Sequence, residues 1–413
     1  MTASIEPSGA RILERCEALA RCSEETGALT RVFLSPEQRA ANEHVQAWMR
    51  EAGMNARLDG IGNVVGRYEG RSAGAPCLML GSHLDTVRDA GRYDGMLGVV
   101  TAIDCVHVLH ERGTRLPFAI EVVGFADEEG VRFGATLLGS RAIAGTFDPA
   151  LLDARDGGGT TMRAALTAFG LDPDGIPGAA RRRSDVLAYA ELHIEQGPVL
   201  EAEGLPVGVV TAINGASRLA VEIEGLAGHA GTVPMPLRRD ALAAAAECVL
   251  AVESRCTREP DLVGTVGRIE AAPGATNVIP GNARFTIDVR APRDEQRQQA
   301  VIDIEAATAA ICARRNTKVS MRRTHEGRTA ACAPWLQDQI GRAIEAEGLR
   351  ARRLPSGAGH DGMAIVDLAD IGMLFVRCEG GISHNPLEAI TIADAELSAR
   401  VFLRFIEHFQ PAA

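Results

Sequence analysis

The sequence lacks the features that mark nucleic-acid-binding, membrane-spanning or disulfide-bonded proteins. Acidic residues outnumber basic ones by 54 to 43, and the net charge of −11 argues against partners that need concentrated Lys and Arg. No apolar stretch approaches the roughly 20 residues that cross a bilayer, and no apolar segment predicts a signal peptide. The nine cysteines include no CxxC pair, which favours reduced thiols in a cytoplasmic protein over cysteine zinc sites. We therefore expect small-molecule partners.

What remains is an ordinary globular composition in a long chain. The 413 residues are 46% hydrophobic and 23% charged, enough for two or three domains that each bury a core. Short apolar runs alternate with amphipathic segments such as 36–52, a helix with Ser35 as N-cap and Pro36 at its first position. The predicted fold class is α/β, with a mixed sheet and helices on both faces.

The first chemically informative stretch is an apolar strand that ends in polar residues. Cys77 to Gly81 reads as a buried strand, and His83 and Asp85 follow at its end, where the second can orient the first. Asp94, flanked by a glycine, follows in a loop. A His with an orienting carboxylate and a second Asp resembles the start of a metal site. The alternative is structural, with His83 capping the strand and Asp94 turning the loop.

The same pattern recurs twice farther along the chain. The apolar run 119–126 is followed directly by Asp127, Glu128 and Glu129. These three carboxylates would repel one another unless a cation or a proton offset their charge. A solvated acidic loop is the alternative. A third apolar run then ends at His193. Because metal-ligand residue types follow each strand, repetition favours a metal site over chance.

The pattern of the chain predicts a discontinuous large domain with a smaller insertion. Residues 1–212 and 330–413 are assigned to a metal-binding catalytic domain, and 213–329 to an inserted α+β sandwich with hairpin-like strands. Residues 153–187, rich in Gly, Pro, Asp and Arg, are expected to form a surface excursion. The GxGxxG match at 357–362 is rejected as a dinucleotide site, because no strong strand precedes it.

Five residues of mixed nitrogen and oxygen type are too many for one catalytic zinc, which uses about three protein ligands. They divide between two divalent ions if Asp94 bridges them, and zinc, manganese or cobalt would suit the donors. Glu128 lies beside a ligand without being one, so it is the expected general base. The predicted ligands are His83, Asp94, Glu129, His193 and His384.

Seven motifs carry a resemblance to a known family. GSHLDT, YDG, DEEG, HIEQGPVLE, GHAGT, NVIPG with DVR, and SHNP occur in the order found in the binuclear-metal aminoacylase and carboxypeptidase superfamily. Within it the chain resembles the hydantoinase and carbamoylase branch of amidases, where a His at position 193 is typical. The resemblance implies a metal-dependent amidohydrolase whose inserted domain acts as a lid and mediates homodimerisation.

The same resemblance implies roles for residues beyond the ligands. His229 would stabilise the oxyanion. Arg290, whose planar fork suits a carboxylate, could instead pair with Asp288 or Glu222. The residues expected to hold substrate are Gln196, Arg218, Asn277, Arg290 and the backbone near Gly357.

The substrate class follows from the branch. GHAGTVPM, Arg218 followed by Leu219, and FVRCEGGISHNP are closest to allantoate amidohydrolases, which release ammonia and CO2 from a ureido acid. N-carbamoyl-L-amino-acid and ureidoglycolate hydrolysis are the alternatives. A binding protein that keeps the metals without turnover is disfavoured, because a binder has no need of Glu128.

Overall fold

The computed structural model describes residues 5–412, which form two compact units. The large unit contains the chain up to Thr211, Ala331–Leu354 and the residues from Ala358 onward. The inserted unit contains Ala212–Ala330, and Pro355–Gly357 also belong to it, which the sequence did not suggest. Each unit has a hydrophobic core of its own.

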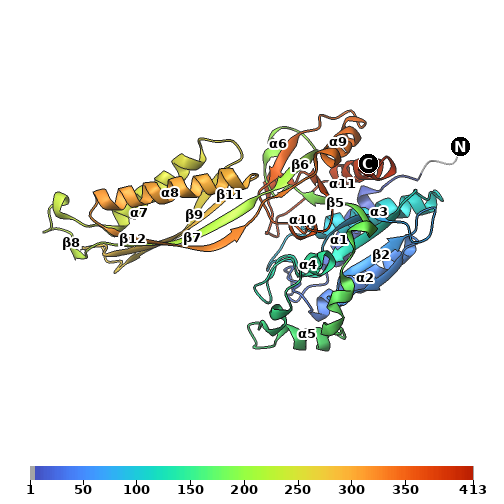
Figure 1. The fold of residues 1–413 in the computed structure, drawn as a ribbon, viewed down its shortest axis with the longest axis horizontal. Coiled ribbons are helices and arrows are strands. Elements are labelled where there is room, and N and C mark those ends of the chain that lie inside the picture. Colours follow the sequence, from blue (N-terminus) through green and yellow to red (C-terminus); the bar gives the residue numbers. More distant parts are fainter. Residues whose placement is uncertain (1–4, 413) are drawn as a thin grey trace. The chain divides into compact units, whose positions relative to one another are not determined.

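The large unit is built on a mixed sheet with the strand order β1-β2-β4-β3-β5-β15-β6-β13, and β14 pairs with β6 (Figure 1). The central strands β4, β3, β5 and β15 are parallel, whereas β2 and β6 run antiparallel to their central neighbours. The strands are β1 (Asn55–Leu58), β2 (Val64–Tyr68), β3 (Cys77–His83), β4 (Ala119–Phe125), β5 (Val186–Ile194), β6 (Val207–Ile213), β13 (Ala330–Ala331), β14 (Arg353–Ser356) and β15 (Ile371–Val376).

Helices cover both faces of this sheet. Leu78 and Leu80 of β3 belong to the main core, together with apolar residues of α1, α2, α3, α9 and α11. The side chains between them alternate to the other face, where α10 packs against α4 and β5. The predicted α/β class is thus confirmed. The helices are α1 (Gly9–Ala20), α2 (Pro36–Glu51), α3 (Met96–Glu111), α4 (Leu138–Ala144), α9 (Pro334–Glu345), α10 (Gly362–Ile365) and α11 (Ile392–Glu407).

The segment expected to be a surface excursion does lie on the surface, but it is folded and contributes to a core cluster of its own. It forms the short helices η1 (Pro149–Asp153), α5 (Met162–Ala168), η2 (Pro173–Ala179) and η3 (Arg183–Asp185). Their apolar residues form a separate core cluster with Phe33 and Ala126. Some of its Gly and Pro residues lie in turns and others lie within the short 3-10 helix η2, so the composition resembles that of a loop.

The GxGxxG match also differs from expectation in one respect. A short strand, β14, does precede it, but the helix that follows, α10, has only four residues. A dinucleotide site uses the N-terminus of a full crossover helix to hold the pyrophosphate. The rejection therefore stands on the helix and not on the strand.

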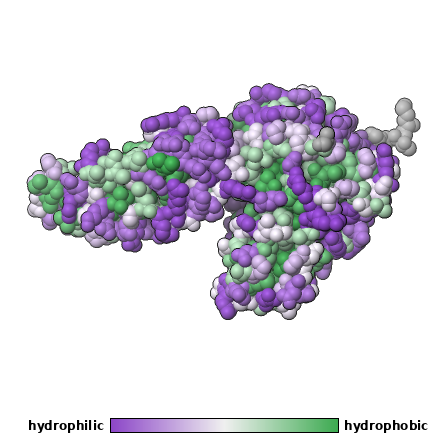
Figure 2. All heavy atoms as spheres, in the orientation of Figure 1, coloured by the Kyte–Doolittle hydropathy of each residue, from purple (hydrophilic) through white to green (hydrophobic). Residues whose placement is uncertain are grey.

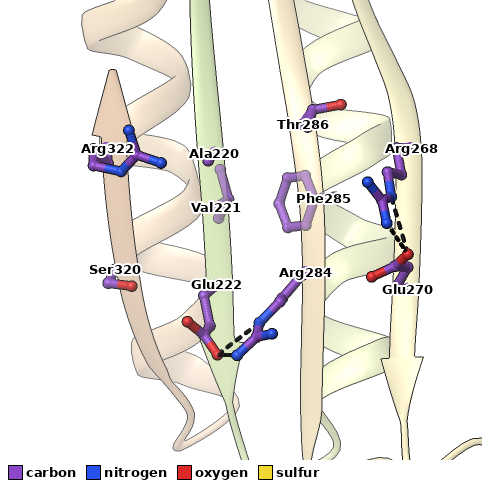
Figure 3. Close-up of a pocket in the computed structure, with 10 residues that line it drawn as sticks. All are labelled: Ala220, Val221, Glu222, Arg268, Glu270, Arg284, Phe285, Thr286, Ser320 and Arg322. Atoms are coloured by element: carbon purple, nitrogen blue, oxygen red, sulfur yellow. Dashed lines mark hydrogen bonds and ion pairs between the residues drawn. The ribbon is translucent and has the colours of Figure 1, made fainter. Parts of the chain in front are cut away.

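The inserted unit is an antiparallel sheet with helices on one face. Its strand order is β12-β7-β11-β9, and the core side chains of β7 and β11 pack against α7 and α8. The opposite face is open and polar, and Figure 3 shows part of it, with the ion pairs Arg284–Glu222 and Arg268–Glu270. The elements are β7 (Gly215–Glu224), α7 (Ala241–Cys256), β9 (Val263–Ala272), β11 (Asn282–Ala291), α8 (Asp294–Arg314) and β12 (Lys318–Gly327).

A small ribbon extends the inserted unit at one end. β8 (Gly228–His229) pairs antiparallel with β10 (Val278–Ile279), just beyond the end of β7 and before the start of β11 (Figure 1). The opposite end of the sheet, where β7 begins, carries the pair Arg290↔Ala216. The two ends of the sheet therefore display different residues.

Over the described residues, no helix combines the length and apolar character needed to span a bilayer. All nine cysteines carry free thiols, and most are buried.

Candidate metal centre and substrate residues

The parallel strands bring three predicted ligands to one edge of the large sheet. His83 is the last residue of β3, His193 is the next to last of β5, and Glu129 follows the end of β4. Parallel strands end at the same edge, so side chains at their carboxyl ends meet there. Asp94, just before α3, and His384, in the loop after β15, complete the group. The structure thus brings together all five residues predicted as ligands.

Asp94 lies at the centre of the cluster and faces both halves of it. Its Oδ1 is 3.2 Å from Nε2 of His193 and 3.6 Å from Nε2 of His83. Its Oδ2 is 3.2 Å from Nε2 of His384, and that nitrogen is 3.5 Å from Oε1 of Glu129. In both trios, His83–Asp94–His193 and Asp94–Glu129–His384, the potential ligand atoms lie within 4.8 Å of one another.

The two buried histidines are held with Nε2 free to act as a ligand. Nδ1 of His83 donates to the backbone oxygen of Asp85 at 3.0 Å, and Nδ1 of His193 donates to that of Ile194 at 2.9 Å. In its neutral form each ring therefore presents an Nε2 lone pair to Asp94. Among the described residues, Nε2 of His193 finds no hydrogen-bond partner although it is buried. A buried nitrogen lone pair aimed at a carboxylate fits a metal cation between them.

Asp85 acts differently from the expectation that its carboxylate orients His83. The carboxylate is 3.6 Å from the ring nitrogen, and the backbone oxygen makes the short contact instead. The carboxylate accepts the backbone N–H groups of Glu128 and Glu129 at 2.9 and 3.1 Å. Asp85 thus fixes the tautomer of one ligand through its backbone and positions the acidic loop through its side chain.

Gly95 allows the predicted ligands His83 and Asp94 to approach each other. It adopts a φ of +74°, and a Cβ there would lie 2.5 Å from the ring of His83. A side chain would therefore push His83 out of line and strain the backbone that carries Asp94. Helix α3 begins immediately afterwards, so the glycine also sets where the helix starts.

The charges in the cluster are strongly coupled in the metal-free protein. Burial alone would raise the pKa of Asp94, but the three histidines around it hold that pKa well below its usual range. Hydrogen bonding to Asp94 raises the pKa of His384. Burial alone would lower the pKa of His193, but the contact with Asp94 outweighs burial and raises that pKa. The donor set is thus arranged to stabilise positive charge around Asp94.

The two glutamates after β4 have raised pKa values. Burial, followed by the charge of Glu129, raises the pKa of Glu128 well above its usual range. Burial raises the pKa of Glu129 to about 7. Carboxylates buried together bind a proton or a cation more readily than isolated ones. The solvated acidic loop considered for these residues does not form, since Glu128 is buried.

A hydrogen-bond network that the sequence did not reveal supports Asp94. Oε1 of the buried Glu388 accepts the backbone N–H groups of Tyr93 and Asp94 at 2.7 and 3.1 Å, and its Oε2 lies 3.1 Å from Oγ of Ser383. Gln196 donates through Nε2 to Asp94 Oδ2 and to Ser383 Oγ, both at 2.9 Å. Gln196, predicted to hold substrate, thus contacts the carboxylate of Asp94.

A second buried polar group lies beneath the cluster. Glu191 accepts hydrogen bonds from Ser82 Oγ and Tyr189 OH at 2.8 and 2.9 Å. It lies with His193 and His360 within metal-ligating distance. Because His193 already donates through Nδ1 and directs Nε2 at Asp94, this group is an extension of the cluster and not a separate site.

In the inserted unit, Arg218 and Arg290 meet at one carboxylate. Arg290 donates to Asp288 through Nε at 3.0 Å and Nη2 at 3.1 Å, and Arg218 donates to Asp288 Oδ2 through Nε at 3.0 Å. Nη1 of Arg290 donates to the backbone oxygen of Gly357 at 2.8 Å. Of the two partners considered for Arg290, the structure has Asp288, since Glu222 pairs with Arg284.

His229 and Asn277 lie together at the other end of the inserted sheet. His229 is exposed on β8, opposite Val278, and Ala230 N donates to the backbone oxygen of Asn277 at 3.0 Å. From Asn282 to Arg290, β11 runs eight residues along the sheet, or roughly 26 Å. Within one chain, the two predicted substrate groups of the inserted unit are thus far apart.

Comparison with known proteins gives a family match over most of the chain. The family described as Peptidase family M20/M25/M40 matches residues 79–408. The chain is 41% identical over 394 residues to an N-carbamoyl-L-amino acid amidohydrolase from Geobacillus stearothermophilus, covering 95% of this chain and 96% of that protein. It is 39% identical over 425 residues to allantoate deiminase 2 from Glycine max, covering 95% of this chain and 88% of that protein.

A solved structure agrees with both the sequence and the architecture. The fold is similar to that of an amidase of the hydantoinase/carbamoylase family from Burkholderia multivorans, with a TM-score of 0.92 and 33% sequence identity. The similarity covers 99% of this chain and all of that one.

Proposed function

The chain belongs to peptidase family M20/M25/M40 and is an amidohydrolase acting on carbamoyl amides, and we propose that its substrate is a ureido acid, with allantoate as the first candidate. Hydrolysis of the ureido group consumes water and leaves an amine, ammonia and CO2. The observation that carries the proposal is the cluster of His83, Asp94, Glu129, His193 and His384 around one buried carboxylate.

Two divalent cations fit this cluster. His83 and His193 would hold one ion, Glu129 and His384 the other, and Asp94 would contribute to both. Bound there, the ions would polarise the carbonyl to be attacked and lower the pKa of a water molecule. The mixed nitrogen and oxygen donors suit zinc, manganese or cobalt.

Glu128 is the proposed general base. It is buried beside Glu129, and its Oε1 would lie 3.3 Å from a Cβ built on Gly359, so the carboxylate lies close to the backbone of that glycine. Burial and then the charge of Glu129 raise its pKa, so its carboxylate holds a proton more tightly than an isolated glutamate does. It would take the proton from the attacking water and deliver it to the departing nitrogen.

The substrate carboxylate is assigned to Arg218 and Arg290, with the Gly357 backbone beside them. His229 would stabilise the oxyanion that forms on the attacked carbonyl, and Asn277 would hold the ureido group. Gln196 reaches Asp94, so it would contact the ureido end of the substrate from the metal side.

A homodimer is proposed from the distance between these groups. Arg290 and His229 lie at opposite ends of one inserted unit, so a small substrate can meet both only if they come from different chains. The end that carries β8 also exposes hydrophobic side chains, including Met235 at 73% and Leu237 at 72% (Figure 2). Exposed apolar surface of this kind favours contact with a second copy.

The test is ammonia release by enzyme reconstituted with zinc, manganese or cobalt, using allantoate, several N-carbamoyl-L-amino acids and ureidoglycolate. We expect allantoate to have the highest kcat/KM. N-carbamoyl-L-amino-acid hydrolysis is the second candidate, favoured by the 41% identity to the Geobacillus protein. Higher activity on N-carbamoyl-L-amino acids would select that candidate, and no release from any ureido acid would contradict the proposal.

A further inference from the structure

The open face of the inserted sheet carries two arginines on a single carboxylate. Arg218 of β7 stands directly opposite Asp288 of β11, and Arg290 follows two residues later on the same face. They line a cavity of about 640 Å³ together with Thr265, Thr324 and Gly357. We call the group of Arg218, Asp288 and Arg290 the arginine clamp.

We propose that Asp288 is the positioning and specificity-determining residue of this clamp: it joins the two arginines into one group of single positive charge, which selects ureido acids that carry one carboxylate. The inference rests on the proposed function, because it concerns which ureido acids the same site accepts.

The guanidinium of Arg290 is held in a fixed orientation. A guanidinium has five N–H groups. In Arg290, Asp288 occupies two of them and the Gly357 backbone oxygen occupies a third, so among the described residues two remain, one on each Nη. Because the guanidinium is held by Nε as well as by both Nη atoms, it cannot rotate about its stem. It therefore presents a fixed pair of donors, which matches the two oxygens of a carboxylate.

The arginine clamp carries one net positive charge at neutral pH. Burial alone would raise the pKa of Asp288, but the hydrogen bonds from Arg290 and Arg218 lower it, so its carboxylate is ionised at neutral pH. The neighbouring His325 is neutral, because burial and then the charge of Arg218 lower its pKa. Two guanidinium charges and one carboxylate leave the clamp with a net charge of +1. One substrate carboxylate neutralises it, and a second would be repelled by Asp288.

The rest of the same face provides a comparison. Arg284 pairs with Glu222, and Arg268 pairs with Glu270, so each of these arginines has a glutamate of its own (Figure 3). Glu222 of β7 pairs with Arg284 of β11, and Asp288 of β11 pairs with Arg218 of β7, so both carboxylates link the same two strands. It is therefore a matched control position on the same strands, outside the clamp.

The experiment compares two ureido acids that differ by one carboxylate, N-carbamoylglycine and N-carbamoyl-L-aspartate. The parent should favour the monocarboxylate by at least about tenfold in kcat/KM, since like charges at short range oppose binding. In Asp288→Asn the clamp gains one positive charge, and the ratio should shift toward the dicarboxylate by about tenfold or more. The effect should be found mainly in KM. Glu222→Gln should leave the ratio unchanged.

Asp288→Glu separates charge from geometry. It keeps the net charge but moves the carboxylate by one methylene, so the ratio between the two substrates should stay near that of the parent while KM rises for both. An unchanged ratio in Asp288→Asn, with both substrates impaired equally, would overturn the proposal and leave Asp288 a structural residue. If the parent hydrolyses no ureido acid, the proposed function fails, and that outcome is distinct from an unchanged ratio in an active enzyme.

Discussion

Glu128 and Glu129 are adjacent in sequence, yet they have different surroundings. Both lie within metal-ligating distance of His83, but Glu129 also groups with Asp94 and His384, whereas Glu128 faces Gly359. Adjacent side chains diverge in direction, so one can bind a cation while the other exchanges protons. Variants of these two residues test whether Glu128 is the general base and Glu129 a metal ligand.

Glu128→Gln should retain both metal ions and lose catalysis. Gln keeps the size of the side chain but cannot accept the proton of the attacking water, so kcat should fall by at least about 10²-fold. Metal content measured by mass spectrometry and ammonia release measured on the same sample check this. Near-normal turnover in the variant would remove Glu128 from the mechanism.

Glu129 should make the stability of the metal-free protein depend on pH. Its pKa is about 7 in the folded protein and about 4.3 in an unfolded chain, so the folded state binds more protons between these values. Its contribution to the free energy of unfolding therefore falls as pH rises from about 4.3 to 7, by no more than about 4 kcal/mol.

Glu129→Gln, which cannot ionise, should flatten that fall. Urea unfolding of the metal-free parent and variant at pH 5 and pH 7.5 measures the difference, and bound metal should reduce it in the parent by offsetting the carboxylate charge. Equal pH dependence in the two metal-free proteins would mean that Glu129 does not hold a proton in the fold.

At the scale of elements, the strand ends explain how much of the site the sequence could predict. His83, Glu129 and His193 follow three apolar runs, and the parallel pairing of those strands gathers them without further information. Hydrophobic runs and ligand residue types are both local signals. The α/β class could be read from the same runs.

Contacts between distant segments could not be predicted in this way. Glu388 meets the backbone of Asp94 across 294 residues, and no spacing rule connects them. Strand β12 could not be predicted because it is an edge strand rich in charged residues, in which Val319 and Met321 are the half-buried apolar side chains. The packing of residues 147–185 was missed because its apolar residues are interspersed with turn residues.

Glu388 joins the loop of Asp94 to the loop of His384, so its removal should weaken metal binding. A Cβ on Gly91 would lie 2.1 Å from its carboxyl carbon, so the two loops are in close contact there. Glu388→Ala leaves the N–H groups of Tyr93 and Asp94 without their acceptor, and metal affinity should fall by about 10- to 100-fold.

Glu388→Gln is the matched control, since its amide oxygen can accept the same two N–H groups and should preserve most of the affinity. Calorimetric titration with zinc and the visible spectrum of the cobalt-substituted protein report the loss and any change in ligand geometry. Parental affinity and spectrum in the alanine variant would show that the loops hold their positions without Glu388.

At the scale of the whole molecule, the proposed dimer predicts complementation between inactive variants. Arg290→Ala and His229→Ala should each be nearly inactive alone. In a mixed dimer, one of the two sites would combine intact Arg290 from one chain with intact His229 from the other. After unfolding and refolding of an equal mixture, about a quarter of the parental activity should return. If dimers shown to contain both variants recovered no activity, Arg290 and His229 would not act together at a site shared between two chains.

The points where the inserted unit begins and ends lie side by side. Gly215 N donates to Thr329 Oγ1 at 3.1 Å, and in the large unit Cys332 N donates to the backbone oxygen of Thr211 at 3.0 Å. Since β6 and β13 are neighbours in the large sheet, joining them directly would make an ordinary hairpin. The main segment of the inserted unit therefore leaves and re-enters the large sheet at one place, so replacing Ala212–Ala330 would leave every predicted ligand on the large unit in its place in the chain.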